Sequence, residues 1–280
     1  MADFPRTRIE DLSVSRLLMG TNWWLGFSHT SAAKDDEIRR TMTPERIARI
    51  MEVFLAAGVD GVIGHPDPKL VEAVRIAQDR AGRQVIIFGT PHLNVSGEPG
   101  ADDDNRRVFD EFARWGCRVC MPHQQTTDAL LDRRTRTIRD MDRYCVMMRE
   151  RGMIPGLSTH MPETPVYADE SGLDVATYIQ IYNAAGFLMQ IEIDWVHRMI
   201  WQCKKPVITI KPLAVNKVLP LVGLAFNWST LRDCDMVCAG TSTPDEAREV
   251  IEISLSLLER RMSQVELQKT RSKASVAPEA

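Results

Sequence analysis

The stretch Gly58-Val-Asp-Gly-Val-Ile-Gly-His65 decides the fold, because a short apolar run ends there at a histidine. Three later runs have the same form: Gln84-Val-Ile-Ile-Phe-Gly-Thr-Pro-His92, Arg118-Val-Cys-Met-Pro-His123 and Met153-Ile-Pro-Gly-Leu-Ser-Thr-His160. Continuous apolar runs of this length are typical of parallel strands that are buried on both faces. The pattern predicts four such strands, each ending where polar residues begin.

Apolar runs alternate with amphipathic helices about eight times from residue 15 onward, which predicts a (β/α)8 barrel, the TIM-barrel class of α/β fold. Thr43-Pro44 and Asp67-Pro68 each supply an N-cap residue followed by proline at the first helical position. Because such barrels take about 200 to 250 residues as one domain, we predict a single domain over 1–262. Residues 263–280 are rich in Lys, Ser, Ala and Pro, and we expect them to form a disordered tail.

Composition narrows the choice of partners. A hydrophobic content of 44%, a charged content of 26% and a net charge of −3 favour a small-molecule substrate and give no electrostatic reason to expect nucleic acid or a membrane surface. No stretch approaches the ~20 apolar residues that span a bilayer, and the N-terminus lacks a secretory apolar segment. We therefore expect a cytoplasmic protein with free thiols at its six cysteines. Homo-oligomerisation stays open.

Seven short stretches, in order along the chain, indicate a relationship to a known family. The predicted strands are counted from the first apolar run, Ser15-Arg-Leu-Leu-Met-Gly20. The stretches are Gly20-Thr21-Asn22-Trp23, Ala57-Gly58-Val59-Asp60, His123 after strand 4, Gly156-Leu157-Ser158 on strand 5, Gln190 on strand 6, Lys211-Pro212-Leu213 after strand 7, and Ala239-Gly240-Thr241-Ser242-Thr243-Pro244-Asp245-Glu246. In this order they resemble the aldo-keto reductase family over about residues 8–262. The resemblance implies an aldo-keto reductase-like barrel. It also implies NADP as the cofactor, held by Ser158, Gln190 and the turn Gly240-Thr241-Ser242 at a helix N-terminus.

The catalytic residues of that family are mostly replaced in this chain. The family uses an Asp, Tyr, Lys and His tetrad in which the tyrosine gives the proton. Here Ile63 stands at the Asp position and Thr90 at the Lys position, and the loop after strand 2 is too short to place a tyrosine. His123 is the member that remains, and Ile210 replaces the aromatic residue that stacks on nicotinamide. Hydride transfer with the family's proton donor is therefore predicted to be lost.

The same alignment places other residues in the site. Successive side chains of a strand point to opposite faces, so a residue two positions beyond a site position shares its face. The residues placed in this way are His65, His92, His160 and Glu192, which would converge beside His123. Imidazole is the commonest transition-metal ligand, and three histidines with an open position form a catalytic zinc site. We predict that His65, His92, His123 and His160 bind a divalent transition metal, Zn, Mn or Fe.

Further residues near the predicted strand ends have two interpretations each. Glu192 is a metal ligand or general base, or else a carboxylate that stabilises a helix N-terminus. Lys211 stabilises an oxyanion or enolate, or else is a solvated lysine at a strand end. Asn22 is predicted to hydrogen-bond the substrate, and Trp23 and Trp24 to stack against it or to pack the first loop.

Our main hypothesis is a metal-dependent hydrolase, lyase or isomerase that acts on a small carbohydrate-like or hydroxy-carbonyl compound. In it Glu192, Lys211 and His123 are catalytic and the metal polarises oxygen or activates water. The alternative is a divergent NADP-dependent oxidoreductase in which a histidine replaces the lost tyrosine as proton donor. A third hypothesis is a non-catalytic barrel that only binds a ligand.

Overall fold

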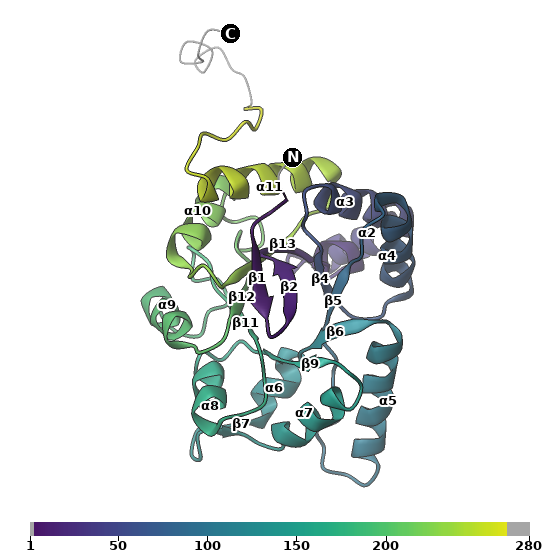
Figure 1. The fold of residues 1–280 in the computed structure, drawn as a ribbon, viewed down its shortest axis with the longest axis vertical. Coiled ribbons are helices and arrows are strands. Elements are labelled where there is room, and N and C mark those ends of the chain that lie inside the picture. Colours follow the sequence, from purple (N-terminus) through teal and green to yellow (C-terminus); the bar gives the residue numbers. More distant parts are fainter. Residues whose placement is uncertain (1–2, 268–280) are drawn as a thin grey trace.

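Parallel strands form a ring in the computed structural model, which describes residues 3–267 (Figure 1). Nine segments are hydrogen-bonded in the order β10, β11, β12, β13, β3, β4, β5, β6, β9. The two outer segments, β9 (Ile154–Pro155) and β10 (Leu157–Ser158), are halves of one strand interrupted at Gly156. The N–H of Gly156 donates to Cys120 and that of Leu157 to Thr177, so this strand bonds both neighbours. Eight strands thus close the sheet, and the predicted (β/α)8 barrel is confirmed.

The remaining elements follow the predicted alternation. The other barrel strands are β3 (Leu17–Gly20), β4 (Gly61–Gly64), β5 (Ile86–Gly89), β6 (Cys117–Cys120), β11 (Tyr178–Ile181), β12 (Val207–Ile210) and β13 (Met236–Gly240). The helices are α1 (Asn22–Leu25), α2 (Ala32–Thr41), α3 (Pro44–Ala56), α4 (Pro68–Ala81), α5 (Ala101–Arg114), α6 (Gln124–Leu130), α7 (Met141–Arg149), α8 (Glu163–Ser171), α9 (Ile193–Gln202), α10 (Pro220–Thr230) and α11 (Pro244–Leu258). Two antiparallel hairpins complete the fold, β1 (Arg6–Ile9) with β2 (Leu12–Ser15) and β7 (Leu131–Asp132) with β8 (Thr137–Ile138).

Capping residues fix where several helices begin. The side chains of Thr43, Asp67 and Thr243 each accept a backbone N–H from the first turn of α3, α4 and α11, respectively. A proline follows each cap, where its missing N–H leaves no hydrogen bond unmade. These starts confirm the helix boundaries predicted at Thr43 and Asp67.

The N-terminal hairpin closes one end of the barrel. Ile9 of β1 and Val14 of β2 are fully buried and belong to the same apolar cluster as Leu18, Phe88 and Ile208 of the barrel strands. In Figure 1 the hairpin lies within the ring of strands. Since the hairpin fills the end where the strands begin, the carboxyl ends of the strands border the space that is left for a ligand.

The sixth barrel strand differs from the prediction. Gln190 was expected on this strand, but the strand is β11, which ends at Ile181, and Gln190 lies in the loop between β11 and α9. Asn183 holds the start of that loop, since its side-chain oxygen accepts from the N–H groups of Ala185 and Phe187. The placement of Gln190 on a strand is therefore wrong.

Three predictions concern the cysteines, membrane-spanning segments and the C-terminal tail. All six cysteines are free, five of them buried and Cys234 half-buried, which confirms the prediction of free thiols. Within residues 3–267 no helix is both long and apolar enough to cross a membrane. Of the predicted disordered tail, residues 268–280 lie outside the described part of the chain.

Candidate functional site

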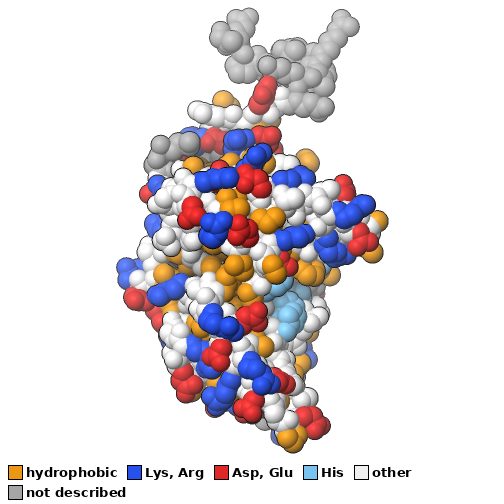
Figure 2. All heavy atoms as spheres, turned by 90° about the vertical axis from the view of Figure 1, so that its right-hand side faces the viewer, with side chains coloured by type: hydrophobic (Ala, Val, Ile, Leu, Met, Phe, Trp, Pro, Cys, Tyr) orange, Lys and Arg blue, Asp and Glu red, His pale blue; other side chains and the backbone are white. Residues whose placement is uncertain are grey.

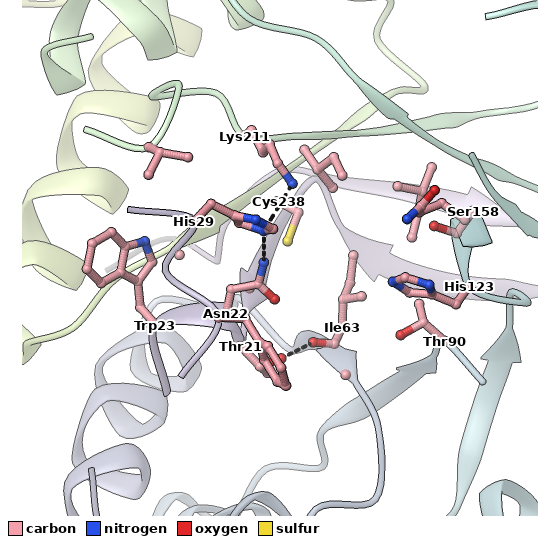
Figure 3. Close-up of a pocket in the computed structure, with 18 of the residues that line it drawn as sticks. Thr21, Asn22, Trp23, His29, Ile63, Thr90, His123, Ser158, Lys211 and Cys238 are labelled. Atoms are coloured by element: carbon pink, nitrogen blue, oxygen red, sulfur yellow. Dashed lines mark hydrogen bonds between the residues drawn. The ribbon is translucent and has the colours of Figure 1, made fainter. Parts of the chain in front are cut away.

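A cavity of about 570 Å³ opens at the carboxyl ends of the barrel strands (Figure 3). Its floor includes the apolar side chains of Ile63, Ile179 and Ile210, and its wall includes Cys238. Loops that follow the strands form the rim. A volume of this size is typical of small-molecule sites, and its position is the one that barrel enzymes use for chemistry.

Four histidines that follow consecutive strands line this cavity. His65 follows β4 directly, His92 and His123 follow β5 and β6 after a proline, and His160 follows β10. The ring centroids of His92 and His123 are 4.1 Å apart. Figure 2 shows histidine side chains grouped at one place on the surface, next to apolar side chains. Across residues 3–267, however, no three His, Cys, Asp or Glu side chains are arranged to hold a metal ion.

His123 is held as a neutral hydrogen-bond donor. It is the N-cap residue of α6, and its Nδ1 accepts the backbone N–H of Gln125 at 3.3 Å. Burial, together with the neighbouring His92 and Lys211, lowers the pKa of His123 to about 4. At neutral pH the ring is therefore uncharged, and because Nδ1 is an acceptor, its proton resides on Nε2. This N–H group is available to an oxygen atom in the cavity.

Burial also lowers the pKa values of His65 and His160. Burial together with the nearby charge of Lys211 lowers the pKa of His160 to about 4. The backbone N–H of His160 donates to Asp128 at 3.1 Å, which fixes the start of the loop after β10. At neutral pH the imidazoles of His123 and His160 are therefore neutral polar groups of the cavity rather than cations.

Lys211 carries the charge in this cavity. It directly follows β12, and its Nζ donates to Nε2 of His29 at 3.5 Å. Nδ2 of Asn22 contacts the same Nε2 at 3.2 Å, so His29 is the acceptor of both groups. Burial lowers the pKa of Lys211, and burial with the charge of Lys211 lowers the pKa of His29. No aspartate or glutamate of the described chain lines the cavity.

The two tryptophans that were predicted to contact substrate have different positions. Trp23 is half-buried and lines the cavity, where Cδ1 of its ring would lie 2.9 Å from a Cβ at Gly240. Trp24 is fully buried, and its Nε1 donates to the carbonyl oxygen of Thr241 at 2.7 Å. Trp24 therefore packs the first loop against the barrel, and its predicted contact with substrate is wrong. Asn22 lines the cavity beside Trp23.

The predicted base Glu192 lies outside this cavity. Glu192 is exposed and precedes α9, where it borders a separate shallow hollow that also contains Gln190. Its placement beside the histidines depended on putting Gln190 on strand 6, and that strand ends at Ile181. The interpretation of Glu192 as a carboxylate near a helix N-terminus agrees with the structure, whereas the interpretation as ligand or base of the histidine site is wrong.

The turn before α11 is already occupied by a carboxylate. The backbone N–H and the hydroxyl of Ser242 both donate to Glu246, at 2.6 and 2.8 Å. Thr241 is buried, and neither it nor Ser242 lines the cavity. Because the Ser242 groups that would receive a phosphate are satisfied within the chain, the predicted phosphate site at this turn is filled by Glu246. Ser158 and Gly240 do line the cavity.

Two wall residues, His29 and Cys238, are not among the predicted site residues. The sequence favours a solvated loop position for His29 over one that reaches the site. His29 was not selected because nothing in a loop sequence shows which side chains return to the barrel. Cys238 carried a usable signal, since Met236, Cys238 and Gly240 alternate along β13 and the period of two puts all three on one face.

Comparison with known proteins supports the fold. No family model matches the chain, and no curated protein matches it. Its fold is similar to that of a protein from Pseudomonas aeruginosa described as an aldo-keto reductase, with a TM-score of 0.67, 15% identity and coverage of 91% of this chain and 98% of that one. An aldo/keto reductase from Brucella melitensis gives a TM-score of 0.59, 14% identity and coverage of 90% and 93%. A glycerol dehydrogenase from Gluconobacter oxydans gives a TM-score of 0.54 and 12% identity, with coverage of 94% of this chain and 99% of that one.

These comparisons decide between the hypotheses drawn from the sequence. The chain has an aldo-keto reductase-like (β/α)8 barrel, as the resemblance implied. The main hypothesis of a metal-dependent hydrolase, lyase or isomerase is wrong, because the similar structures named above are described as aldo-keto reductases and a glycerol dehydrogenase. The histidines also lack the arrangement of a metal site in the described residues.

Proposed function

We propose that the protein is an oxidoreductase that reduces the carbonyl group of a small aldehyde or ketone with NADPH as the hydride source. The observation that carries this proposal is the state of His123, a neutral imidazole whose Nε2 keeps its proton beside the cavity. A neutral imidazole can polarise a carbonyl oxygen by hydrogen bonding. The similarity to aldo-keto reductases supports the choice of reaction.

The cavity residues fit the nicotinamide end of such a cofactor. The floor of Ile63, Ile179 and Ile210 suits an aromatic ring, while Ser158 supplies a hydroxyl beside it. Gly20 and Gly240 face each other on paired strands, and both line the cavity without a side chain. Trp23, Gly240 and Ser158 would hold the nicotinamide portion. The cofactor phosphates do not fit the turn at Ser242 while Glu246 occupies it.

The role of the chain in the reaction follows from these positions. When bound, NADPH supplies a hydride to the carbonyl carbon. The N–H at Nε2 of His123 bonds the oxygen on which negative charge develops, and then passes its proton to that oxygen to complete the alcohol. His123, left as an imidazolate, regains its proton from a water molecule at the open rim, and the hydroxide that remains leaves to solvent. The isoleucine floor keeps water away from the reacting carbon.

A nucleotide titration and two histidine variants, one of them a control, test this proposal. NADPH and NADH are titrated by fluorescence, and oxidation of NADPH is then followed with a set of small aldehydes and ketones. We expect His123→Ala to lower kcat by about 10²- to 10³-fold, as removal of one oxyanion donor does. The control is His197→Ala, because His197 lies on α9 outside the cavity and contacts Tyr182. Failure of both nucleotides to bind at millimolar concentration would overturn the proposal.

A further inference from the structure

Lys211 is an unusual lysine for its surroundings. Its side chain is half-buried, and within residues 3–267 no carboxylate lies within 4.0 Å of its Nζ. Lys205, at the other end of the same strand, has its Nζ 2.7 Å from Asp169. An ammonium group that is partly withdrawn from water without a counter-ion is less stable than a solvated one, and a bound anion offsets that cost. Among the described residues, the ammonium group of Lys211 therefore lacks a counter-ion that a bound anion could provide.

The backbone holds Lys211 in this position. Its φ is 60°, in the left-handed region that few residues other than glycine adopt, and Ala214, Val215 and Asn216 have positive φ in the same loop. The N–H of Ala214 donates to the carbonyl oxygen of Lys211 at 2.9 Å, which fixes the turn. Strain of this kind persists where the surrounding structure enforces it, and it gathers at functional sites.

The hydrogen bonds of Lys211 leave donors for a ligand. One N–H is directed to Nε2 of His29, which also faces the amide of Asn22 and therefore acts as an acceptor. This arrangement favours the ammonium form of Lys211, which has two further N–H groups. Figure 3 shows the Lys211, His29 and Asn22 group on one side of the cavity and His123 with Ser158 on the other, with Ile63 and Cys238 between them.

We propose that Lys211 binds an anionic group, a carboxylate or a phosphate, on the carbonyl substrate, while the carbonyl itself lies toward His123. This inference rests on the proposed function for the carbonyl, and it names the substrate class as small oxo compounds that carry an anion. His123 and His160 line the same cavity, and because their pKa values are lowered to about 4 they do not compete with Lys211 for an anion at neutral pH.

Matched ligand pairs test the proposal on the cofactor-free protein. Calorimetry compares pyruvate with acetone, which replaces the carboxylate by a methyl group, and dihydroxyacetone phosphate with dihydroxyacetone. We expect at least one anion to bind about 10- to 100-fold more tightly than its neutral partner, the range of a charge-assisted hydrogen bond. The pair that shows the preference distinguishes carboxylate from phosphate. Equal affinity within both pairs would overturn the inference.

Two lysine variants locate the effect. Lys211→Met keeps the apolar stem and removes the charge, and it should abolish the preference for the anion. Lys217→Met is the control, because Lys217 belongs to the same loop but lies over the ring of Phe187 and does not line the cavity. An anion preference that survives in Lys211→Met would refute the inference. So would attachment of pyruvate to Lys211 after borohydride reduction, because that lysine would then form an imine.

The outcome also separates this inference from the proposed function. Binding is measured without a nucleotide, so an anion preference that depends on Lys211 stands even where no reduction of carbonyl compounds is found. Conversely, NADPH-dependent reduction of neutral aldehydes with the same efficiency in wild type and Lys211→Met would support the reductase and reject the anionic substrate.

Discussion

Cationic side chains are paired with carboxylates at one end of the barrel, whereas Lys211 at the other end has no such partner within residues 3–267. At the end where the strands begin, Arg232 donates to Asp235 at 2.7 Å and Lys205 pairs with Asp169 at the same distance. At the end where the strands finish, Lys211 faces a cavity without a carboxylate among the described residues. The first end holds the strands together, whereas the second keeps a charge unpaired for a ligand. In (β/α)8 barrels the face at the start of the strands generally serves stability, and the face at their carboxyl ends serves binding and catalysis.

The contrast indicates which end of the barrel contributes to the free energy of unfolding and which end contributes to ligand binding. A buried ion pair that is fully hydrogen-bonded resists removal of either partner. An unpaired cation in a cavity, by contrast, is a local destabilisation that binding relieves, and sites of this kind trade stability for function. Single substitutions at the two ends should therefore change the free energy of unfolding in opposite directions.

The largest expected effect is at the closed end. Asp235 has a fully buried side chain and accepts from the N–H of Val207 as well as from the backbone and guanidinium of Arg232. Asp235→Ala leaves Arg232 unpaired, and we expect a loss of about 3–5 kcal/mol in the free energy of unfolding. Urea denaturation measures it.

Asp233 provides the control for this variant. It lies two residues away with a fully exposed side chain and only a 3.7 Å contact to Arg16. Asp233→Ala should change the free energy of unfolding by less than about 0.5 kcal/mol. Equal losses in the two variants would remove the distinction between the ends that the ion pairs suggest.

The second prediction concerns pH at the open end. His123 and His160 have pKa values of about 4 in the folded protein, below the ordinary value of 6.5. Between these values the unfolded chain takes up protons and the folded chain does not, so stability falls as pH drops from 6.5 to 4. Above pH 6.5 both states are neutral at these rings, and below pH 4 the loss is complete.

A double variant isolates this contribution from carboxylates. His123→Gln with His160→Gln should retain about 1–2 kcal/mol more of its unfolding free energy than wild type on going from pH 7 to pH 4.5. Urea denaturation at the two pH values gives the comparison. A loss in the double variant as large as in wild type would show that these rings titrate normally in the folded protein.

The barrel could be predicted because its strands are short apolar runs that repeat. Buried parallel strands leave a strong signal, and the histidines at their ends identified the open face. The sixth strand was harder to predict, since Tyr178–Ile181 is followed by a loop that also contains apolar residues, among them Leu188, Met189 and Ile191. The resemblance placed Gln190 on a strand, and Glu192 was misplaced with it.

The site itself was only partly predictable. The contact between Lys211 and His29 joins residues far apart in sequence, and it depends on a left-handed backbone at Lys211 that no pattern reveals. The difference between Trp23 and Trp24 has a similar origin. They are adjacent on the short helix α1, so a rotation of about 100° sends one ring to the cavity and the other to the core.

That pair gives the third prediction. Trp24→Phe removes the hydrogen bond to the buried carbonyl of Thr241, and we expect a loss of about 1 kcal/mol in the free energy of unfolding. Trp23→Phe is the matched control at the cavity wall, where ligand affinity should change more than stability. A larger stability loss for Trp23→Phe than for Trp24→Phe would contradict the assignment of the two rings.

The smallest expected effect has the opposite sign. Lys211→Met removes an ammonium group that has no counter-ion in the described chain, and the methionine keeps the apolar stem in contact with the cavity wall. We expect a gain of about 0.5–1 kcal/mol in the free energy of unfolding without ligand, measured in urea at pH 7. The gain should shrink at pH values above the lowered pKa of Lys211, because the wild-type amine is then neutral as well. A loss of stability in Lys211→Met would mean that the ammonium group is well solvated or paired at the open rim, and the contrast between the two ends of the barrel would then be one of position alone.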